Sequence, residues 1–371
     1  MHALIQNGIL SCRQAGHDLG WAGLAEACCL PPAAVEQQNT GQSNKSFTYT
    51  TEEELGITLL FLSTGVSEQT LLRQIGSSPR TLWRIIKRVV CCLCTLGAPR
   101  YIYWPRTQEE WTEVADEFYA ASRGRMYGAA GAIDNTHIDV KLSKDERMGA
   151  VDRNGQFTIH VQAVCTAGWR ILSWRVGDAG SRQDSGVLQE SQLWKAQEES
   201  SSPVIPQGLF LIGDAGFPCR TWLLTPWSQR QNGDVTPDQI RFNRIFCSQR
   251  VVIEQLFGIM KAQWQVLCHV RQYAQWHTLA AMRHYSMAAA VLHNVAIANG
   301  DVTPAQLFKK AQAIQHNTFE ERLQSLLEKN RSTQSGLQSA VEHLSSSHRK
   351  RTEAGFKLLS TVTEEVLRRQ G

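Results

Sequence analysis

The middle of the chain alternates short apolar runs with helical patterns, in an order that few folds can use. Three consecutive apolar runs within residues 127–179 are typical of strands and are separated by turn-like polar segments. A helical pattern over residues 185–199 follows, and then another buried strand within residues 206–218. After a loop-like stretch, residues 221–238, a long helical pattern begins near Asp238. Three strands, a helix, a strand and a helix together predict an α/β core.

Three shorter helical units precede this core. The first starts at a Thr-x-x-Glu capping box, Thr51 to Glu54. The second starts at Ser67 and is closed by Gly76, and the third has Ser78 as its cap and Pro79 at its first helical position. Short helices with tight connections resemble a helix-turn-helix unit. The basic side chains on the third helix that are candidates for contact with DNA phosphate are Arg80, Arg84, Lys87 and Arg88.

The alternative for this segment is an all-helical packing domain with a solvated basic face. Leu82, Ile85, Ile86 and Val89 recur on the other side of the third helix and are expected to face the core under either interpretation. The segment alone does not decide between the two.

On these patterns the chain divides into four parts. Residues 1–50 are rich in Gly, Gln, Asn and Ala and predict a loosely ordered lead-in. Residues 51–125 form the helix-turn-helix-like domain, and residues 126–300 form the α/β core, whose order of elements is that of a ribonuclease-H-like fold. Residues 301–371 predict a helical or mobile polar tail. Its basic run, His348 to Arg351, is either a solvated charge cluster or a nuclear-import signal.

Composition excludes several classes of protein. Apolar residues make up 42% of the chain and charged residues 19%, so a sizeable core forms and disorder does not dominate. No run approaches the ~20 apolar residues of a membrane helix, and we expect no membrane association. The ten cysteines include no CxxC pair, which favours buried free thiols in a reducing compartment, the cytoplasm or the nucleus. A net charge of +4 permits a polyanionic partner without requiring one.

Three carboxylates stand in apolar surroundings. Asp134 ends the run AAGAI, Asp214 follows LFLIG, and Glu254 lies inside an apolar helical pattern. A buried charge is costly unless it is paired or bound to a cation, and ligands gather at the carboxyl ends of strands in open α/β sheets. The three acids therefore predict a site for Mg²⁺ or Mn²⁺, the ions that support phosphodiester chemistry. The alternative is that the aspartates cap turns and Glu254 pairs with Arg250.

Two further side chains are candidates for contact with a substrate phosphate. His137 follows the first aspartate closely, and a purely structural hydrogen bond is the alternative. Lys261 lies seven residues after Glu254, so both side chains project from one face of the helix. A solvated lysine is the alternative for that position.

The chain also contains the blocks GAIDNTHIDV, LFLIGDAGFPCRTWLLTPW and FNRIFCSQRVVIEQLFGIMKAQWQVL. They resemble the catalytic blocks of PIF/Harbinger-type DDE transposases and of the Harbinger transposase-derived nuclease family. FLSTGVSEQTLLRQIGSSPRTLWRIIKRV resembles that family's helix-turn-helix, and AAAVLHNVAI resembles its C-terminal helix. The resemblance extends over residues 55–299, about two thirds of the chain.

The resemblance implies a ribonuclease-H-like fold and metal-dependent cleavage of DNA at transposon ends, with possible strand transfer. It places the family's catalytic and metal-binding acids on Asp134, Asp214 and Glu254. The expected cofactor is Mg²⁺ or Mn²⁺, and the expected substrate is double-stranded DNA. It further implies a Myb/trihelix-like DNA-binding partner protein. We also expect a homo-oligomer that acts in the nucleus.

Two positions depart from the family's pattern. Asn135 stands where the family has glycine, and Gln183 stands where it has histidine. Asp184 is retained, and we interpret it as a helix cap rather than a ligand. These departures keep a second function open, that of a domesticated nuclear protein that binds DNA or another protein without cleaving. The intact acids favour the nuclease.

Overall fold

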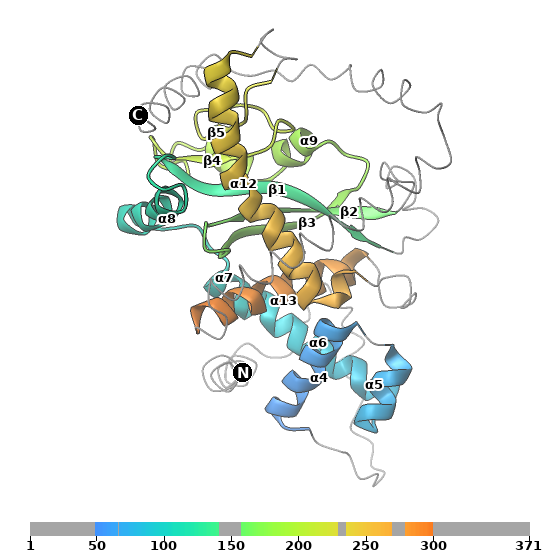
Figure 1. Cartoon of the computed structure of the whole chain (residues 1–371). Coiled ribbons are helices and arrows are strands. Elements are labelled where there is room, and N and C mark those ends of the chain that lie inside the picture. Colours follow the sequence, from blue (N-terminus) through green and yellow to red (C-terminus); the bar gives the residue numbers. More distant parts are fainter. Residues whose placement is uncertain (1–48, 66, 141–156, 229–234, 269–278, 300–371) are drawn as a thin grey trace, which may run out of the picture.

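The computed structural model describes residues 49–65, 67–140, 157–228, 235–268 and 279–299 (Figure 1). Nearly all of the predicted lead-in and the whole predicted tail, with its basic run, lie outside the described residues. No helix of the described part is both long and apolar enough to cross a membrane.

One mixed sheet of five strands forms the centre of the molecule, in the order β3-β2-β1-β4-β5 (Figure 1). The three predicted strands are confirmed as β1 (Ala129–Asp139), β2 (Thr158–Cys165) and β3 (Ile171–Ala179), which pair antiparallel. β4 (Phe210–Ile212) pairs parallel with β1, and β5 (Leu223–Leu224) pairs parallel with β4. The loop predicted around β5 is wrong at those two residues, because so short a strand carries no periodic pattern.

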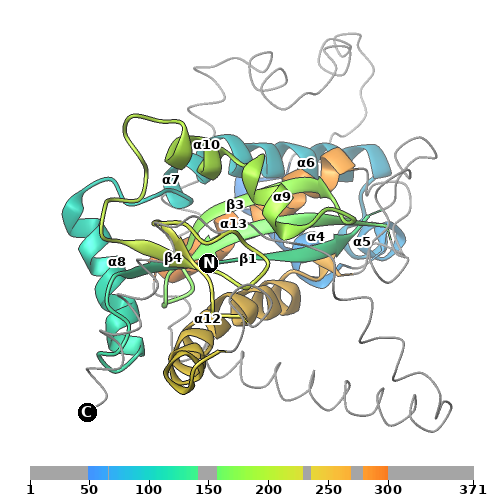
Figure 2. The same ribbon diagram turned by 90° about the horizontal axis from the view of Figure 1, so that it is seen from above.

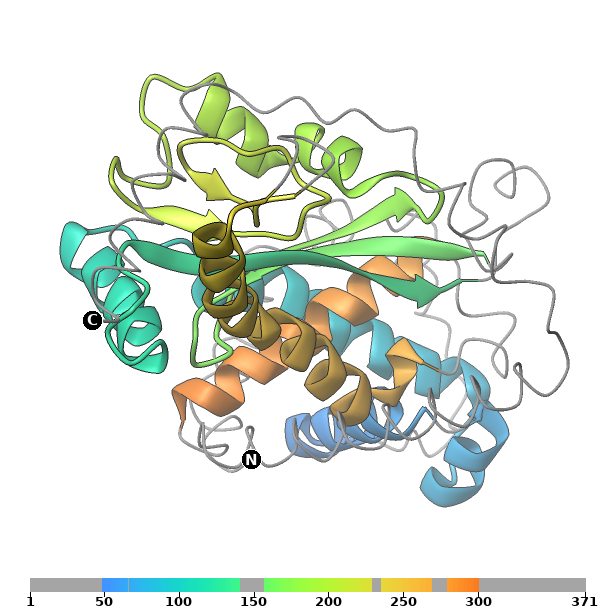
Figure 3. The same cartoon turned by 45° about the horizontal axis from the view of Figure 1, so that its top comes forward.

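Helices cover both faces of this sheet (Figures 2 and 3). On one face lie α9 (Asp184–Gln189) and α10 (Gln192–Glu198), whose buried leucines pack with Ile133 and Leu211 of the sheet. Across the other face lie the long helix α12 (Pro237–Gln263) and the apolar helix α13 (Leu279–Ala298), both as predicted. The two-sided cover makes the sheet interior apolar, so a carboxylate on it needs a compensating partner.

The single helical stretch predicted over residues 185–199 is two helices. Ser191 begins the second one, because its hydroxyl accepts a hydrogen bond from the Trp194 backbone N–H at 3.1 Å. The residue that caps α9 is Gln183, without a side-chain hydrogen bond, and Asp184 is the first residue inside the helix. The prediction that Asp184 is a helix cap is therefore wrong.

The N-terminal helices are α4 (Thr51–Thr64), α5 (Glu68–Ile75) and α6 (Pro79–Cys92). The ring of Phe61 on α4 meets the ring of Tyr285 on α13 edge-on, at 5.2 Å between centroids. These helices therefore share the core beneath the sheet. The described chain continues with a π-helical turn (Leu93–Gly97), α7 (Ala98–Tyr101) and α8 (Gln108–Ala121), which packs against β1.

The predicted helix starts at Ser67 and Ser78 and the end at Gly76 are confirmed. The capping box of α4 is displaced by one residue from the prediction. Thr50, not Thr51, accepts from the Glu53 backbone N–H, and Glu53 accepts from the Thr50 backbone N–H in return. The run TTEEE contains the motif in two registers, and only the packing of the following apolar residues selects one of them.

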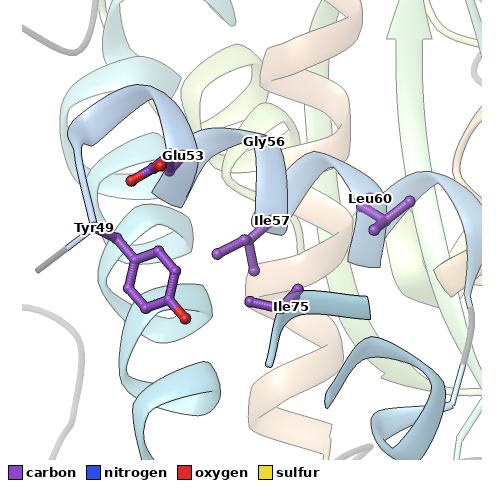
Figure 4. Close-up of a pocket in the computed structure, with 6 residues that line it drawn as sticks. All are labelled: Tyr49, Glu53, Gly56, Ile57, Leu60 and Ile75. Atoms are coloured by element: carbon purple, nitrogen blue, oxygen red, sulfur yellow. The ribbon is translucent and has the colours of Figure 1, made fainter. Parts of the chain in front are cut away.

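A shallow, mainly apolar hollow lies between α4 and α5 (Figure 4). It contains none of the three predicted catalytic acids. Its lining residues are Tyr49, Glu53, Gly56, Ile57, Leu60 and Ile75.

Candidate active site

Two of the predicted acids come together where β1 extends beyond its parallel neighbour. The continuous buried run of β1 ends at Ile133, but its pairing with β2 continues to Asp139. β4 pairs with the first half of β1 and ends at Ile212, so Asp214 leaves the sheet beside Asp134. The negative charge of Asp214 is one of the causes that raise the pKa of Asp134. The sheet therefore brings the two aspartates together, as the sequence predicted.

The turn after β4 holds Asp214 and admits a third aspartate. The Gly216 backbone N–H donates to Asp214 Oδ1 at 2.5 Å. A Cβ on residue 216 would collide with the Asp214 carboxylate and would come within 3.0 Å of Asp184 Oδ2. Glycine at this position thus lets the carboxylates of Asp214 and Asp184 approach the same stretch of backbone.

Arg250 connects the first aspartate with the glutamate. Its Nη1 donates to Asp134 Oδ2 at 2.9 Å, and its Nη2 donates to Glu254 Oε1 one helical turn away. The side chains of Asp134 and Arg250 are each 18% exposed, whereas that of Glu254 is 47% exposed. The alternative in which Glu254 pairs with Arg250 is confirmed as a contact. Because the guanidinium also donates to Asp134, Arg250 links Glu254 to the Asp134 carboxylate.

The helix that carries Arg250 and Glu254 is fixed at its N-terminal half. Thr236 and Gln239 form a capping box at its start. The side-chain amide of Asn243 then accepts from the Trp227 backbone N–H at 2.9 Å and donates to the Trp227 carbonyl at 2.8 Å. These contacts fasten Trp227 to α12, which lies against β1.

Burial is the largest cause that raises the pKa of Asp134, to about 7. The Arg250 guanidinium and the backbone N–H of Asn135 act in the opposite direction, and the charges of Asp214 and Asp184 raise the pKa further. The single guanidinium therefore does not offset the burial of this carboxylate among its acidic neighbours. A more highly charged cation would favour its ionised form.

Sequence reasoning missed the third aspartate of this cluster. Asn135 Nδ2 donates to Asp184 Oδ1 at 2.8 Å and so joins α9 to β1. Asn135 Oδ1 is buried and accepts no hydrogen bond from the described residues. An aspartate at the start of a helix commonly stabilises the helix N-terminus, so Asp184 was not assigned to the site. The available signal was its place at the start of the helix that follows β3, the outer strand of the β1–β2–β3 set.

His137 and Lys261 lie on either side of β1. The His137 ring nitrogen Nδ1 is 2.9 Å from Thr158 Oγ1, and the exposed imidazole lies against the ring of His160, with centroids 4.3 Å apart. Lys261 Nζ donates to Thr136 Oγ1 at 2.9 Å, and burial lowers the pKa of this lysine. Lys261 is thus a partly buried lysine that contacts Thr136, two residues along β1 from Asp134. The alternative of a solvated lysine is wrong.

The basic side chains of α6 are not brought to the acids, because α6 packs against α4 and α13. Arg80, Arg84 and Lys87 are exposed. Arg88 instead forms an ion pair with Glu54 of α4, and the Glu54 side chain is only 14% exposed. Arg88 therefore contributes to the packing of α4 on α6, and the predicted core positions of α6 are buried.

No three His, Cys, Asp or Glu side chains within the described ranges are already grouped as ligands of a metal ion. The donor chemistry at Asp134 nevertheless suits a hard divalent cation. The carboxylates of Asp214 and Asp184 lie close enough to Asp134 for their charges to raise its pKa. The buried amide oxygen of Asn135, the next residue, accepts no hydrogen bond from the described residues, and a cation-bound water would satisfy it.

Comparison with known proteins bears on the same region. A family model described as "DDE superfamily endonuclease" matches residues 133–294, a range that contains Asp134, Asp214 and Glu254. A rat protein named "Putative nuclease HARBI1" is 28% identical over 249 residues, 67% of this chain and 68% of its own length. Its human counterpart is 27% identical over the same shares. An Arabidopsis thaliana protein named "Protein ALP1-like" is 25% identical over 68% of this chain and 62% of its own length. No solved structure matches the chain.

Proposed function

Because the chain belongs to the Harbinger transposase-derived family, we propose that it is a divalent-metal-dependent DNA endonuclease of the DDE type. The observation that carries the proposal is the meeting of Asp134 and Asp214 at the step between β1 and β4, with Glu254 linked to them through Arg250. The five-strand mixed sheet with helices on both faces is the scaffold for this site, and we class it as ribonuclease-H-like.

Asp134 and Asp214 would hold Mg²⁺ or Mn²⁺, and Glu254 would complete the site. A bound cation would supply the means to activate an attacking water or 3′-hydroxyl and to stabilise the leaving oxygen. Arg250 donates to both Asp134 and Glu254, so it compensates their charges and keeps the two acids in place.

The DNA backbone would meet basic groups on both sides of β1. Lys261 offers a partly desolvated ammonium next to Thr136, and His137 presents an exposed imidazole on the opposite face. The exposed Arg80, Arg84 and Lys87 on α6 form a second basic surface, which we assign to a helix-turn-helix contact with double-stranded DNA. Arg88 contributes to this surface only indirectly, because its ion pair with Glu54 supports α6.

The finer points of the activity follow from the same family. We propose cleavage at transposon ends with possible strand transfer, action as a homo-oligomer, and a nuclear location. The net charge of +4 gives the chain only a weak electrostatic attraction to DNA. We therefore propose that a Myb/trihelix-like partner protein supplies much of the DNA affinity.

The test is nicking of supercoiled plasmid in Mg²⁺ or Mn²⁺ by the full chain, alongside Glu254→Gln and Asp134→Asn variants. The natural chain should convert supercoiled plasmid to open circles, and both variants should be inactive. Glu190→Gln is a matched control, because Glu190 is an exposed acid paired with Arg182 away from the three aspartates. It should nick like the natural chain.

If the natural chain does not cut, even with a Myb-like partner and candidate transposon ends supplied, the endonuclease proposal fails. The domesticated binding protein would then be the better description. Equal cutting by the natural chain and the two acid variants would point to a contaminating nuclease and would also count against the proposal.

A further inference from the structure

Asp184 is the acidic residue of this site that lies outside the predicted set of Asp134, Asp214 and Glu254. It is the first residue of α9, reaches β1 from the face opposite α12, and accepts a hydrogen bond from Asn135 through Oδ1. Its other oxygen, Oδ2, lies near the Gly216 backbone beside the Asp214 carboxylate. One carboxylate thus contacts the strand that carries Asp134 and approaches the turn that carries Asp214.

We propose that Asp184 is an additional ligand of the divalent cation, together with Asp134 and Asp214, and that Asn135 is the positioning residue that holds it there. The inference rests on the proposed metal-dependent function and specifies which side chains form its cation site. It adds a fourth acid to the triad of Asp134, Asp214 and Glu254.

Asp184 differs from Glu254 and Glu190, each of which is paired with an arginine. Arg250 compensates Glu254, and Arg182 compensates Glu190 at the far end of α9. Within the part of the chain that the structure describes, Asp184 forms no ion pair with a lysine or arginine, although it lies close enough to raise the pKa of Asp134. A carboxylate kept beside two other carboxylates without a cationic side chain is suited to a metal ion.

The side-chain amide of Asn135 is a second indication that a cation binds beside Asp184. Its nitrogen is committed to Asp184, while its buried oxygen accepts no hydrogen bond from the described residues. A buried acceptor without a hydrogen bond destabilises the fold. A hydrated cation between the aspartates would supply the missing donor through one of its waters.

This arrangement gives the departures from the family's pattern a physical meaning. The resembling family has glycine where this chain has Asn135, and glycine has no side chain with which to reach α9. The chain also has Gln183 in place of histidine directly before Asp184, and Gln183 makes no side-chain cap to the helix. Asn135 therefore fixes the orientation of Asp184 by a contact that this chain provides itself.

The experiment is calorimetric titration of Mn²⁺ into the full metal-free chain at pH 7.5, which reads cation binding without catalysis. The variants are Asp184→Asn, Asn135→Ala, the double variant of these two, and Asp134→Asn. Glu190→Gln serves as the matched control at the end of α9. Urea unfolding of each metal-free protein checks that it is folded.

Asp184→Asn should weaken Mn²⁺ binding by more than about tenfold, and Asn135→Ala by about 10- to 100-fold, as for residues that orient a metal ligand. Asn135→Ala should have little further effect once Asp184 is Asn, because it acts only through that carboxylate. Glu254→Gln should weaken binding less than Asp184→Asn, since Arg250 already compensates Glu254. Glu190→Gln should bind like the natural chain.

Three outcomes would overturn the inference. If Asp184→Asn binds Mn²⁺ as tightly as the natural chain while Asp134→Asn does not, Asp184 is not a ligand, and the proposed nuclease site stands without it. If Asn135→Ala weakens binding equally with and without the Asp184 carboxylate, Asn135 does not act through it. If the natural chain binds no Mn²⁺, the inference and the metal-dependent function fail together.

Discussion

Removal of the Arg250 guanidinium tests the electrostatic reasoning about the site most directly. Arg250 holds Asp134 and Glu254 through one hydrogen bond to each. In the variant Arg250→Gln the helix retains a polar side chain of similar length but loses its positive charge. The Asp134 carboxylate is then left beside Asp214 and Asp184 with no compensating side chain from α12.

The expected size of the effect follows from the exposure of the two partners. Asp134 and Arg250 are both 18% exposed, and a hydrogen bond between charged groups at such a site contributes about 1.5–3 kcal/mol. The Glu254 partner is 47% exposed, so the i,i+4 pair on the helix surface adds only about 0.3–0.5 kcal/mol. We expect Arg250→Gln to lower the free energy of unfolding by about 2–3 kcal/mol at pH 8.

The assay is urea unfolding in EDTA of the natural chain, Arg250→Gln, Asp134→Asn and the double variant. An amide at position 134 needs no counter-charge, so the guanidinium should contribute much less in that background. The coupling energy between the two sites should be about 1.5–2 kcal/mol. Mn²⁺ should stabilise Arg250→Gln more than the natural chain, because the cation no longer competes with the guanidinium for Asp134.

Additivity of the two substitutions within about 0.5 kcal/mol would refute the reasoning, because contacting charges must couple. Equal stabilisation of both proteins by Mn²⁺ would refute the competition between Arg250 and the cation. A change in the slope of the unfolding curve, rather than in its midpoint, would show that the substitution altered the extent of structure and not the ion pair.

Three further predictions concern pH, the substrate and α6. The folded-state pKa of Asp134, about 7, lies above the unfolded value of 3.8, so the folded chain holds this proton more tightly. Protonated Asp134 therefore stabilises the metal-free protein fully below about pH 4, and this stabilisation is lost as the pH rises to about 7. The loss is at most about 4 kcal/mol, and urea unfolding of Asp134→Asn should lack this decline. Lys261→Ala should reduce plasmid nicking by about tenfold or more and leave calorimetric Mn²⁺ affinity unchanged, since the lysine is assigned to phosphate and not to the metal. Arg84→Gln should reduce the slope of DNA affinity against salt by about one in fluorescence anisotropy without loss of stability, whereas Arg88→Gln should cost up to about 1 kcal/mol of stability because it breaks the pair with Glu54.

The backbone around the site could be predicted from sequence because it depends on local patterns. β1, β2 and β3 are apolar runs with clear turns between them, and α12 begins at a Thr-Pro start with a capping box. Asp134 and Asp214 were identifiable because each directly follows a buried apolar run. Once β4 pairs parallel with β1, their meeting follows from the topology.

The contacts that complete the site could not be predicted in the same way, because they join side chains distant in the sequence. Asn135 and Asp184 are 49 residues apart, and Arg250 and Asp134 are 116 residues apart. Periodicity shows which face of an element is buried but not which polar groups meet across the sheet edge. The capping box at Thr50 shows the same limit at short range, because two registers satisfied the local rule.

The energetics of the site bear on the choice between an endonuclease and a binding protein that has lost cleavage. Burial of Asp134 beside Asp214 and Asp184 opposes its ionisation at neutral pH, and Asn135 retains an unsatisfied buried oxygen. Both features lower the stability of the metal-free chain. A protein that only bound DNA through the exposed side chains of α6 would gain nothing from either, and apolar or amide replacements would remove the cost. Destabilising polar groups that converge on one point are the usual accompaniment of a functional site, which favours the endonuclease.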